Sequence, residues 1–467
     1  MDDSAASQDA DLADDSAKAQ LDIIEVVPEG DLLLDVTFET SKATLKAARK
    51  AARPRPGRPI AQPALRPKVR LSYRVDLATL KGHSRYFSNL LGDTRFSEAR
   101  SIAEALEKLS IRKVKPSEAD AKELPVVKIH EDDEAARTAG RETAFEDLLR
   151  ILHGKDAVTK PTMQYLATLA VLADRFDCTA PVSRYLTHGF KYKWPATQAR
   201  LSKEDGHALS RPAEETLRQK ILVAWLLDQP LKMHTATREL ILYGSRKWSV
   251  SFDEEEASTA GELIWDLPDD LERELQYRRE CILNTIASIQ RHFLQLYTSR
   301  TRQCKLGYES SSSCDSYQLG EMVKFLVGRD LLQLVDFSTN SFGEIKDHST
   351  VEIGQIIVTL RQCSGYQIDK NHTNCGLRIR LLPILDYIQS MLSSNIISIS
   401  RPTWKKDRDS VSWFPSEEVD DHSEPTVFRF TRSTAMDQRF RFEGAMATDR
   451  LARTLFTADQ WDWTPEY

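Results

Sequence analysis

The stretch "RVDLATLKGHSRYFSNLLGDTRF", residues 74–96, decides the fold of the N-terminal part of the chain. Its apolar residues recur at helical spacing, but Gly82 interrupts them, and Gly inside a helix costs about 1 kcal/mol relative to Ala. We therefore expect two short helices that meet at a corner. Gly82 in the left-handed conformation would end the first helix. Ser84 would cap the second by accepting a hydrogen bond from a free backbone N–H group.

The elements around this corner predict a small α+β domain. Residues 31–39 alternate between apolar and polar and predict a strand, and a second strand is expected from residue 70. A third strand and two helices are expected after the corner, at residues 124–130, 144–155 and 160–178. Two charged or Pro-rich insertions interrupt the domain, at residues 41–69 and 99–123. We expect the first insertion to lie on the surface without contributing to a core.

Several motifs in this order resemble the BTB/POZ domain, a protein-interaction fold. "LLLDVTF" is similar to the opening strand of that family, and "DLATLKGHSRYFSNLL" to its first helical segment. "FEDLLRILHGK" and "LATLAVLADRFDC" are similar to two later helices. The resemblance covers residues 31–193, and the whole chain is similar to filamentous-fungal BTB proteins with a long helical second half. Two features depart from the pattern. Asp76 stands where the family usually has His, and "ILHG" stands where the family has an aromatic motif.

The resemblance implies self-association, as a homodimer, or binding of other protein partners. In this family the strand and the corner nearest the N-terminus usually form the contact surface. The side chains that would form it here are Leu32, Leu34, Val36, Phe38, Leu80, Phe87 and Leu91. The alternative is that these side chains fill the core of their own subunit, which is the usual position of an apolar helix face.

A second contact is suggested by "RFSEA", in which Phe96 and Glu98 resemble the element that docks some BTB domains onto a cullin ubiquitin-ligase scaffold. An apolar anchor beside an orienting charge is physically suited to such docking. Chance occurrence on a charged surface is the alternative. The sequence contains none of the motifs G-x-G-x-x-G, G-x-x-x-x-G-K-[ST], G-x-S-x-G or H-E-x-x-H. We therefore expect a protein that is not an enzyme.

Cysteine and histidine residues cluster late in the chain, at Cys304, Cys314, Cys363, His372 and Cys375. Thiolates and imidazole are the ligands of tetrahedral zinc. Cys304, Cys314, His372 and Cys375 are the candidate ligands of a structural zinc, or of a zinc-containing enzyme or regulatory domain, in residues 300–380. Separately buried thiols are the alternative, since free cysteine is common in protein cores. No other cofactor is expected.

Composition limits the remaining possibilities. The chain has 467 residues and a net charge of −6, which does not suit a generally basic nucleic-acid-coating protein. The longest apolar run, "ILVAWLL", is too short for a membrane span, and no secretory signal opens the chain. We expect an intracellular protein, in the nucleus or the cytoplasm. The basic tract in residues 41–70 is equally consistent with a nuclear-import signal and with a solvated insertion.

The other parts of the chain divide by composition. Residues 1–30 are acidic and predict a disordered tail. A linker at residues 194–212 precedes a mainly helical domain at residues 213–400. Within it, Ile282, Ile286, Ile289, Phe293 and Leu296 form an apolar stripe on one long helix, as a coiled-coil seam or as core packing. Residues 401–467 form a mixed tail rich in tryptophan, either a docking peptide or a strap on the helical domain. Short strands are expected in this tail at residues 426–432 and 438–444, and an exposed aromatic end at residues 459–467.

Overall fold

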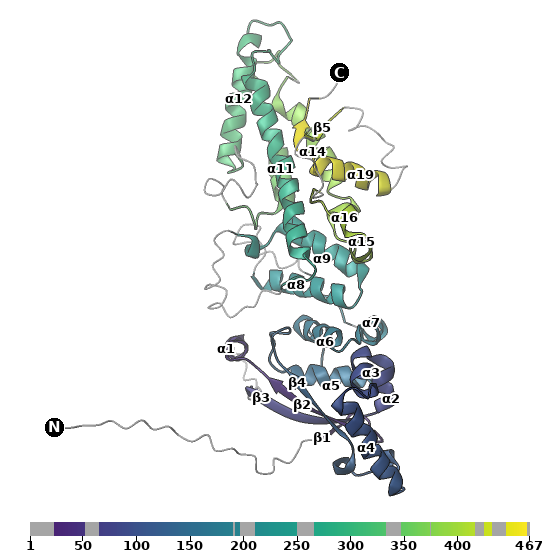
Figure 1. Ribbon diagram of the computed structural model, residues 1–467. Helices are drawn as coiled ribbons and strands as arrows, with labels where there is room; N and C mark the ends of the chain where they lie inside the picture. The colour runs from purple at the N-terminus through teal and green to yellow at the C-terminus, as the bar shows by residue number, and fades with distance from the viewer. Residues whose placement is uncertain are drawn as a thin grey trace, which may run out of the picture. The chain divides into compact units, whose positions relative to one another are not determined.

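The computed structural model describes residues 23–51, 65–189, 192–196, 211–249, 266–332, 347–373, 375–415, 425–431 and 445–464. The chain divides into two compact units, each of which is described by itself. Unit 1 comprises residues 1–160 and 172–182, and unit 2 comprises residues 161–171 and 183–467. The fold is mixed α and β, mostly helical with a small sheet, as the sequence predicts (Figure 1).

A four-stranded sheet forms the centre of unit 1, in the order β1-β3-β2-β4. Its strands are β1 (Ile23–Glu25), β2 (Leu32–Glu39), β3 (Lys68–Val75) and β4 (Val126–Glu131). Strand β2 is antiparallel to β3 and parallel to β4, and β1 is parallel to β3. The prediction that residues 1–30 are disordered is wrong for residues 23–30, because β1 pairs in the sheet and Val26 is fully buried. Residues 1–22 lie outside the described residues.

The predicted corner is present between α2 (Leu77–His83) and α3 (Arg85–Gly92). Ser84 caps α3 as expected: its hydroxyl oxygen accepts the Phe87 N–H hydrogen bond at 3.0 Å. The same hydroxyl donates to the Phe176 carbonyl oxygen at 2.6 Å. The role predicted for Gly82 is wrong, because Gly82 lies inside α2 and is not among the positive-φ residues. Extended backbone at Ser84 ends the helix instead.

Both insertions contribute to the core of unit 1, so the prediction of a purely surface insertion at residues 41–69 is wrong for its first part. That part forms α1 (Lys42–Ala51), which buries Leu45. Residues 52–64 lie outside the described residues. The second insertion forms α4 (Ser97–Ile111) and the short helices η1 (Pro116–Glu118) and η2 (Ala121–Glu123). Leu109 and Leu124 pack with Leu33 of β2, which buries the face of β2 that the alternation assigned to solvent.

Aromatic rings fill the other part of this core. Phe145, on α5 (Arg141–Leu152), contacts Phe38 of β2 edge-on at 5.6 Å between centroids. Phe145 also contacts Phe176 at 5.3 Å, and Phe176 stacks on Phe87 at 5.5 Å with the rings 5° from parallel. Such pairs contribute about 0.5–1.5 kcal/mol each beyond the burial of their area. The aromatic cluster therefore joins the sheet to the helical corner.

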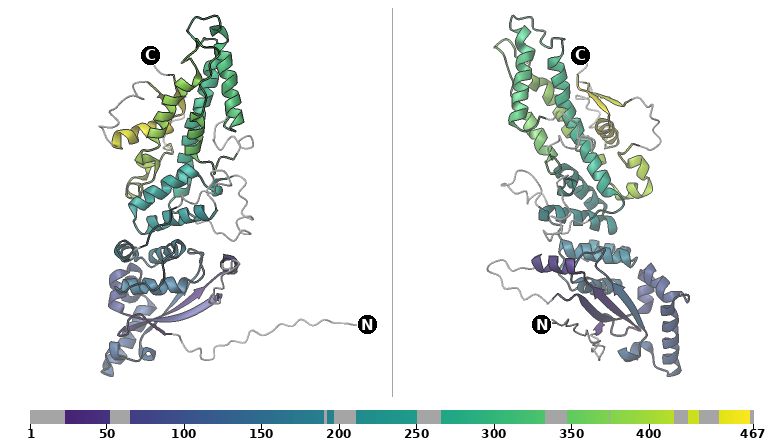
Figure 2. Two further views of the ribbon diagram at one scale, coloured as in Figure 1. Left: turned by 180° about the vertical axis from the view of Figure 1, so that it is seen from behind. Right: turned by 60° about the vertical axis from the view of Figure 1, so that its left-hand side comes forward.

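Unit 2 is built around the long helix α11 (Leu271–Thr298), which the sequence predicts. Figure 2 shows α11 running lengthwise beside α12. Its apolar stripe is buried in the core of the unit, so core packing is the correct alternative. The remaining helices of the two units are α6 (Met163–Arg175), α7 (Thr179–His188), α8 (Arg211–Leu226), α9 (Pro230–Tyr243), η4 (Arg246–Trp248), α12 (Ser311–Gly328), α13 (Ile353–Arg361), α14 (Leu377–Met391), η6 (Asn395–Ile397), α15 (Arg401–Lys406), α16 (Arg408–Val411) and α19 (Ala445–Phe456). Among the described helices, none has the length and apolar character needed to cross a bilayer.

The C-terminal tail packs on unit 2 as a strap. Trp404, Trp413 and Trp463 are buried in its core. The burial of Trp463 corrects the expectation of an exposed aromatic end at residues 459–467. The Trp463 indole N–H donates to the Ser288 hydroxyl of α11 at 2.9 Å. Two short strands of the tail, β5 (Val427–Arg429) and β6 (Gln460–Asp462), pair in parallel. The strand expected in residues 438–444 lies outside the described residues.

Two adjacent buried arginines on α11 hold distant segments of unit 2. Arg278 donates to the carbonyl oxygens of Ile396, Ser398 and Val411 at 2.8–3.0 Å and pairs with Glu274 at 2.7 Å. Arg279 donates to the carbonyl oxygens of Ile241, His348 and Val351 at 2.6–2.8 Å. Burial lowers the pKa of Arg279 to about 9, so it stays protonated at neutral pH. One helix therefore satisfies the carbonyl groups of four separate chain segments.

Truncation of Phe145 to Ala is expected to destabilise unit 1 by about 3–5 kcal/mol, because it removes a fully buried ring from the aromatic cluster. Phe96, which is 43% exposed, provides the control. Phe96→Ala is expected to change stability by less than about 0.5 kcal/mol. Native-state hydrogen exchange of the amides of unit 1, read by mass spectrometry, measures both effects. Equal effects of the two variants would contradict the assignment of Phe145 to the core.

Arg278→Met is expected to destabilise unit 2 by about 3–5 kcal/mol, because it leaves Glu274 buried without its partner and three carbonyl groups without their donor. Arg273→Met serves as the control, because Arg273 lies on the exposed side of the same helix. Its guanidinium group lies over the Phe414 ring. Hydrogen exchange of the segments 395–399 and 410–413 reports the loss. Unchanged protection of both segments in Arg278→Met would refute the role given to Arg278.

Candidate functional site

The seven side chains expected to form a self-association surface are all buried within unit 1. Their exposed fractions are at most 4%, from 0% for Leu34 and Phe87 to 4% for Leu91. They therefore correspond to the alternative interpretation, in which they fill the core of their own subunit. This corrects the expectation that they form an exposed apolar edge. The residues concerned are Leu32, Leu34, Val36, Phe38, Leu80, Phe87 and Leu91.

The residues proposed for docking onto a cullin scaffold are positioned differently. Phe96 is 43% exposed and occupies the N-cap position of α4. Glu98 lies in the first turn of α4 and accepts a hydrogen bond from the Ser97 hydroxyl at 2.9 Å. Tyr86, on the neighbouring helix α3, is 38% exposed. Partial burial raises the pKa of Tyr86, and the nearby Glu98 carboxylate adds to this effect. We call Tyr86, Phe96 and Glu98 the α3–α4 patch.

The four candidate zinc ligands lie together in unit 2. One ligand atom each from Cys304, Cys314 and His372 forms a group in which every pair lies within 4.8 Å, and all three residues are buried. The Cys375 sulfur lies 3.4 Å from the Cys314 sulfur, so the two thiols are in contact but are not joined by a disulfide. Cys314 and Cys375 are 61 positions apart in the sequence. Folding therefore brings together residues that the sequence identifies only as candidate ligands. We call these four residues the Cys₃His cluster.

The environment of Cys304 stabilises a thiolate. Burial opposes its ionisation, but hydrogen bonds from the Ser311 hydroxyl, the Leu306 backbone N–H and the other two thiols lower its pKa to about 7. Burial and the neighbouring thiols raise the pKa of Cys314. Burial, together with the Cys304 thiol, also raises the pKa of Cys375. The hydrogen bond from His372 to Asp369 raises the pKa of the imidazole. Close thiols therefore repel one another once charged, unless a cation is bound between them.

Cys363 does not belong to the cluster, although the sequence places it near His372. Its thiol is fully buried and donates to the Ser364 carbonyl oxygen at 3.7 Å. Burial raises its pKa to about 11. Two acidic residues that hydrogen-bond to members of the cluster, Asp315 and Asp369, were not predicted from the sequence. The available signal was their position, one residue after Cys314 and three residues before His372.

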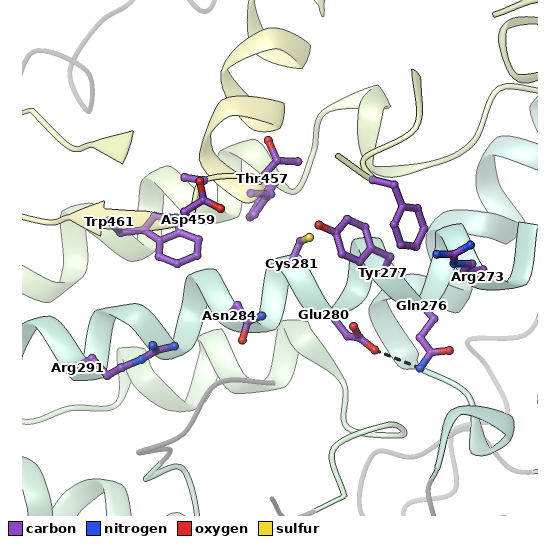
Figure 3. Close-up of a pocket in the computed structure, with 13 residues that line it drawn as sticks. Arg273, Gln276, Tyr277, Glu280, Cys281, Asn284, Arg291, Thr457, Asp459 and Trp461 are labelled. Carbon is purple, nitrogen blue, oxygen red and sulfur yellow. Dashed lines mark hydrogen bonds between the residues drawn. The ribbon is translucent and has the colours of Figure 1, made fainter. Parts of the chain in front are cut away.

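A separate pocket of about 540 Å³ lies in unit 2 between α11 and the C-terminal strap. Figure 3 shows Tyr277 and Cys281 pointing from α11 toward Thr457 and Asp459 of the strap. On the other side of the helix, the Gln276 amide donates to the Glu280 carboxylate at 3.1 Å. Tyr277 stacks on Phe414 at 4.1 Å between centroids. The pocket is therefore lined by both polar side chains and aromatic rings.

The pocket residues do not form an activated nucleophile. Burial raises the pKa of the Cys281 thiol to about 12, so it stays protonated at neutral pH. Its hydrogen-bond partner is the Tyr277 hydroxyl, whose pKa is also raised by burial. No histidine lies among the residues that line the pocket. The arrangement therefore lacks the nucleophile and base pair that covalent catalysis requires.

Comparisons of the chain with protein-family models, with curated proteins and with solved structures found no match. The assignment of function therefore depends on the residues of this chain and on their geometry.

Proposed function

We propose that the chain is a non-enzymatic protein-interaction protein whose unit 1 binds a partner protein through the α3–α4 patch. The observation that supports this most is the exposure of two aromatic side chains, Tyr86 at 38% and Phe96 at 43%. They lie on helices that pack against each other. Aromatic residues are enriched among the side chains that contribute most to binding at protein interfaces. Glu98 beside them supplies a charge that orients a partner.

The resemblance to BTB/POZ domains supports the same proposal. The order strand, strand, helix pair, strand, helix, which the resemblance rests on, is the order of β2, β3, α2, α3, β4 and α5. The two insertions and β1 extend this arrangement. Since the side chains first expected at a dimer interface are buried, we place partner contact at the α3–α4 patch instead. A homodimer, if it forms, would use other residues than these seven.

A specific candidate is the role of substrate adaptor for a cullin ubiquitin ligase. The position of Phe96 favours it, because an exposed aromatic anchor at the start of a helix is followed one turn later by solvent-facing polar residues. In this role the patch would hold the scaffold, and unit 2 would hold the client. The zinc-containing enzyme is the weaker alternative, since four protein ligands leave no open position for water or substrate on a tetrahedral ion.

Phe96→Asp is expected to weaken binding of a purified cullin scaffold to the full chain at least tenfold, because it places a charge at the apolar anchor. Glu98→Lys is expected to weaken binding severalfold and to change its salt dependence. Ile111→Asp is the matched control, since Ile111 is 74% exposed at the other end of α4. Calorimetry or interferometry with the purified proteins measures these affinities.

If the unsubstituted chain does not bind the cullin scaffold, the adaptor role is wrong. The wider proposal is then tested by affinity purification of the full chain from cells, with quantitative mass spectrometry of the partners. Partners that are lost from Phe96→Asp and kept by Ile111→Asp support the α3–α4 patch. Partners retained equally by both variants would overturn it.

A further inference from the structure

The Cys₃His cluster has the donor set of a tetrahedral metal site. Bonds of about 2.3 Å from zinc to sulfur and about 2.0–2.1 Å to nitrogen place neighbouring ligand atoms roughly 3.5–3.8 Å apart. The contact of 3.4 Å between the sulfurs of Cys314 and Cys375 is close to this separation. The ligand atoms of Cys304, Cys314 and His372 lie within 4.8 Å of one another, so they would close slightly onto a bound ion. Three sulfurs and one imidazole nitrogen favour zinc over magnesium or calcium, which prefer oxygen.

The histidine is held in the orientation that a metal ligand needs. The Nδ1 atom of His372 lies 2.8 Å from the Asp369 carboxylate. That carboxylate also accepts hydrogen bonds from the Ser310 hydroxyl and, at 2.8 Å, from the Asn371 backbone N–H. With Nδ1 engaged in this way, Nε2 is the nitrogen that faces the cluster, where it lies 3.4 Å from the Ser311 hydroxyl and next to the Cys304 thiol. A carboxylate that fixes the ring of a metal-bound histidine is a recurrent second-sphere arrangement, because it sets the tautomer and raises the basicity of the ligand.

The chain segments that carry the cysteine ligands are also fixed by hydrogen bonds and by their place at helix ends. Asp315 on α12 accepts the N–H groups of Gln303 and Cys304, at 2.7 and 3.2 Å, and so fixes the turn that carries Cys304. That turn continues through Gly307 with φ of 75°, a left-handed conformation that suits glycine. Cys314 lies in the first turn of α12 and Cys375 lies two residues before α14, where the positive ends of the helix dipoles favour thiolates.

We propose that Cys304, Cys314, His372 through Nε2, and Cys375 bind one structural Zn²⁺ ion in unit 2. The ion would join three segments: the loop after α11, the start of α12, and the loop before α14. The Gln318 side chain bridges the last two of these directly, through Tyr366 and Leu377. With four protein ligands the site is closed, so the ion contributes to folding free energy and not to catalysis. The proposal is independent of the partner-binding role of unit 1.

The metal content of the purified full chain, expressed with added zinc and measured by inductively coupled plasma mass spectrometry, tests this directly. We expect about one zinc per chain. The double variant Cys314→Ser/Cys375→Ser is expected to lose it. Cys363→Ser is the matched control, because Cys363 is as fully buried as Cys314 and lies in the same unit but outside the cluster. Retention of zinc by Cys363→Ser supports the assignment.

A spectroscopic titration keeps the test valid if the double variant does not fold. Addition of Co²⁺ to the unsubstituted, zinc-free chain is expected to produce the intense visible and near-ultraviolet bands of a tetrahedral ion with thiolate ligands. Asp369→Asn is expected to lower zinc affinity about 10–100-fold, measured by competition with a coloured chelator. Removal of zinc should also lower the thermal unfolding midpoint of the unsubstituted chain.

Two results would overturn the proposal. The first is zinc content in the unsubstituted chain no higher than in the double variant, together with a Co²⁺ spectrum that lacks thiolate bands. The second is equal loss of zinc from Cys363→Ser and from the double variant. Neither result would bear on the α3–α4 patch, because its residues lie in unit 1.

Discussion

Buried arginines that donate to backbone carbonyl groups or to carboxylates connect the elements within each unit. Their exposed fractions are at most 7%, and they are Arg74, Arg141, Arg218, Arg278 and Arg279. In unit 1, Arg74 donates to Gly30 and Ala119, at 2.9 and 3.2 Å, so it joins strand β3 to the insertion after α4. A charge in a protein interior is costly unless it is fully hydrogen-bonded. Each guanidinium group therefore permits only those chain arrangements that bring enough acceptors to it.

The same constraint explains how segments of unit 2 that are far apart in the sequence are held together. Arg218 makes a bidentate pair with Glu272, at 2.5 and 2.7 Å, and so joins α8 to the start of α11. Arg278 and Arg279 then fix segments that come much later in the chain. Near the C-terminal end of α11, the Cys₃His cluster connects chain segments that are far apart in the sequence. Hydrogen-bonded arginines and the proposed zinc ion perform the same task, because both satisfy several distant donors or acceptors from one point.

The two candidate functional features differ in kind. The α3–α4 patch exposes apolar rings beside a charge, which is the composition of a surface that binds another protein. The Cys₃His cluster is buried and closed, which is the composition of a site that stabilises its own chain. The Cys281 thiol in the pocket beside α11 is not an activated nucleophile, because burial raises its pKa to about 12.

Local signals in the sequence were sufficient for several elements, because each depends on residues close to one another in the chain. The Ser84 cap, the long helix α11 and the mixed α+β composition follow from capping chemistry and apolar periodicity. The four members of the Cys₃His cluster were identified by residue type alone. Their convergence needed the tertiary structure, since Cys314 and Cys375 are 61 positions apart. Periodicity likewise showed that Leu34 and Phe87 belong to apolar faces, but not that their own subunit covers them. The burial of Leu33 and of the five arginines was not predictable, because it depends on insertions and carbonyl groups supplied from elsewhere in the chain.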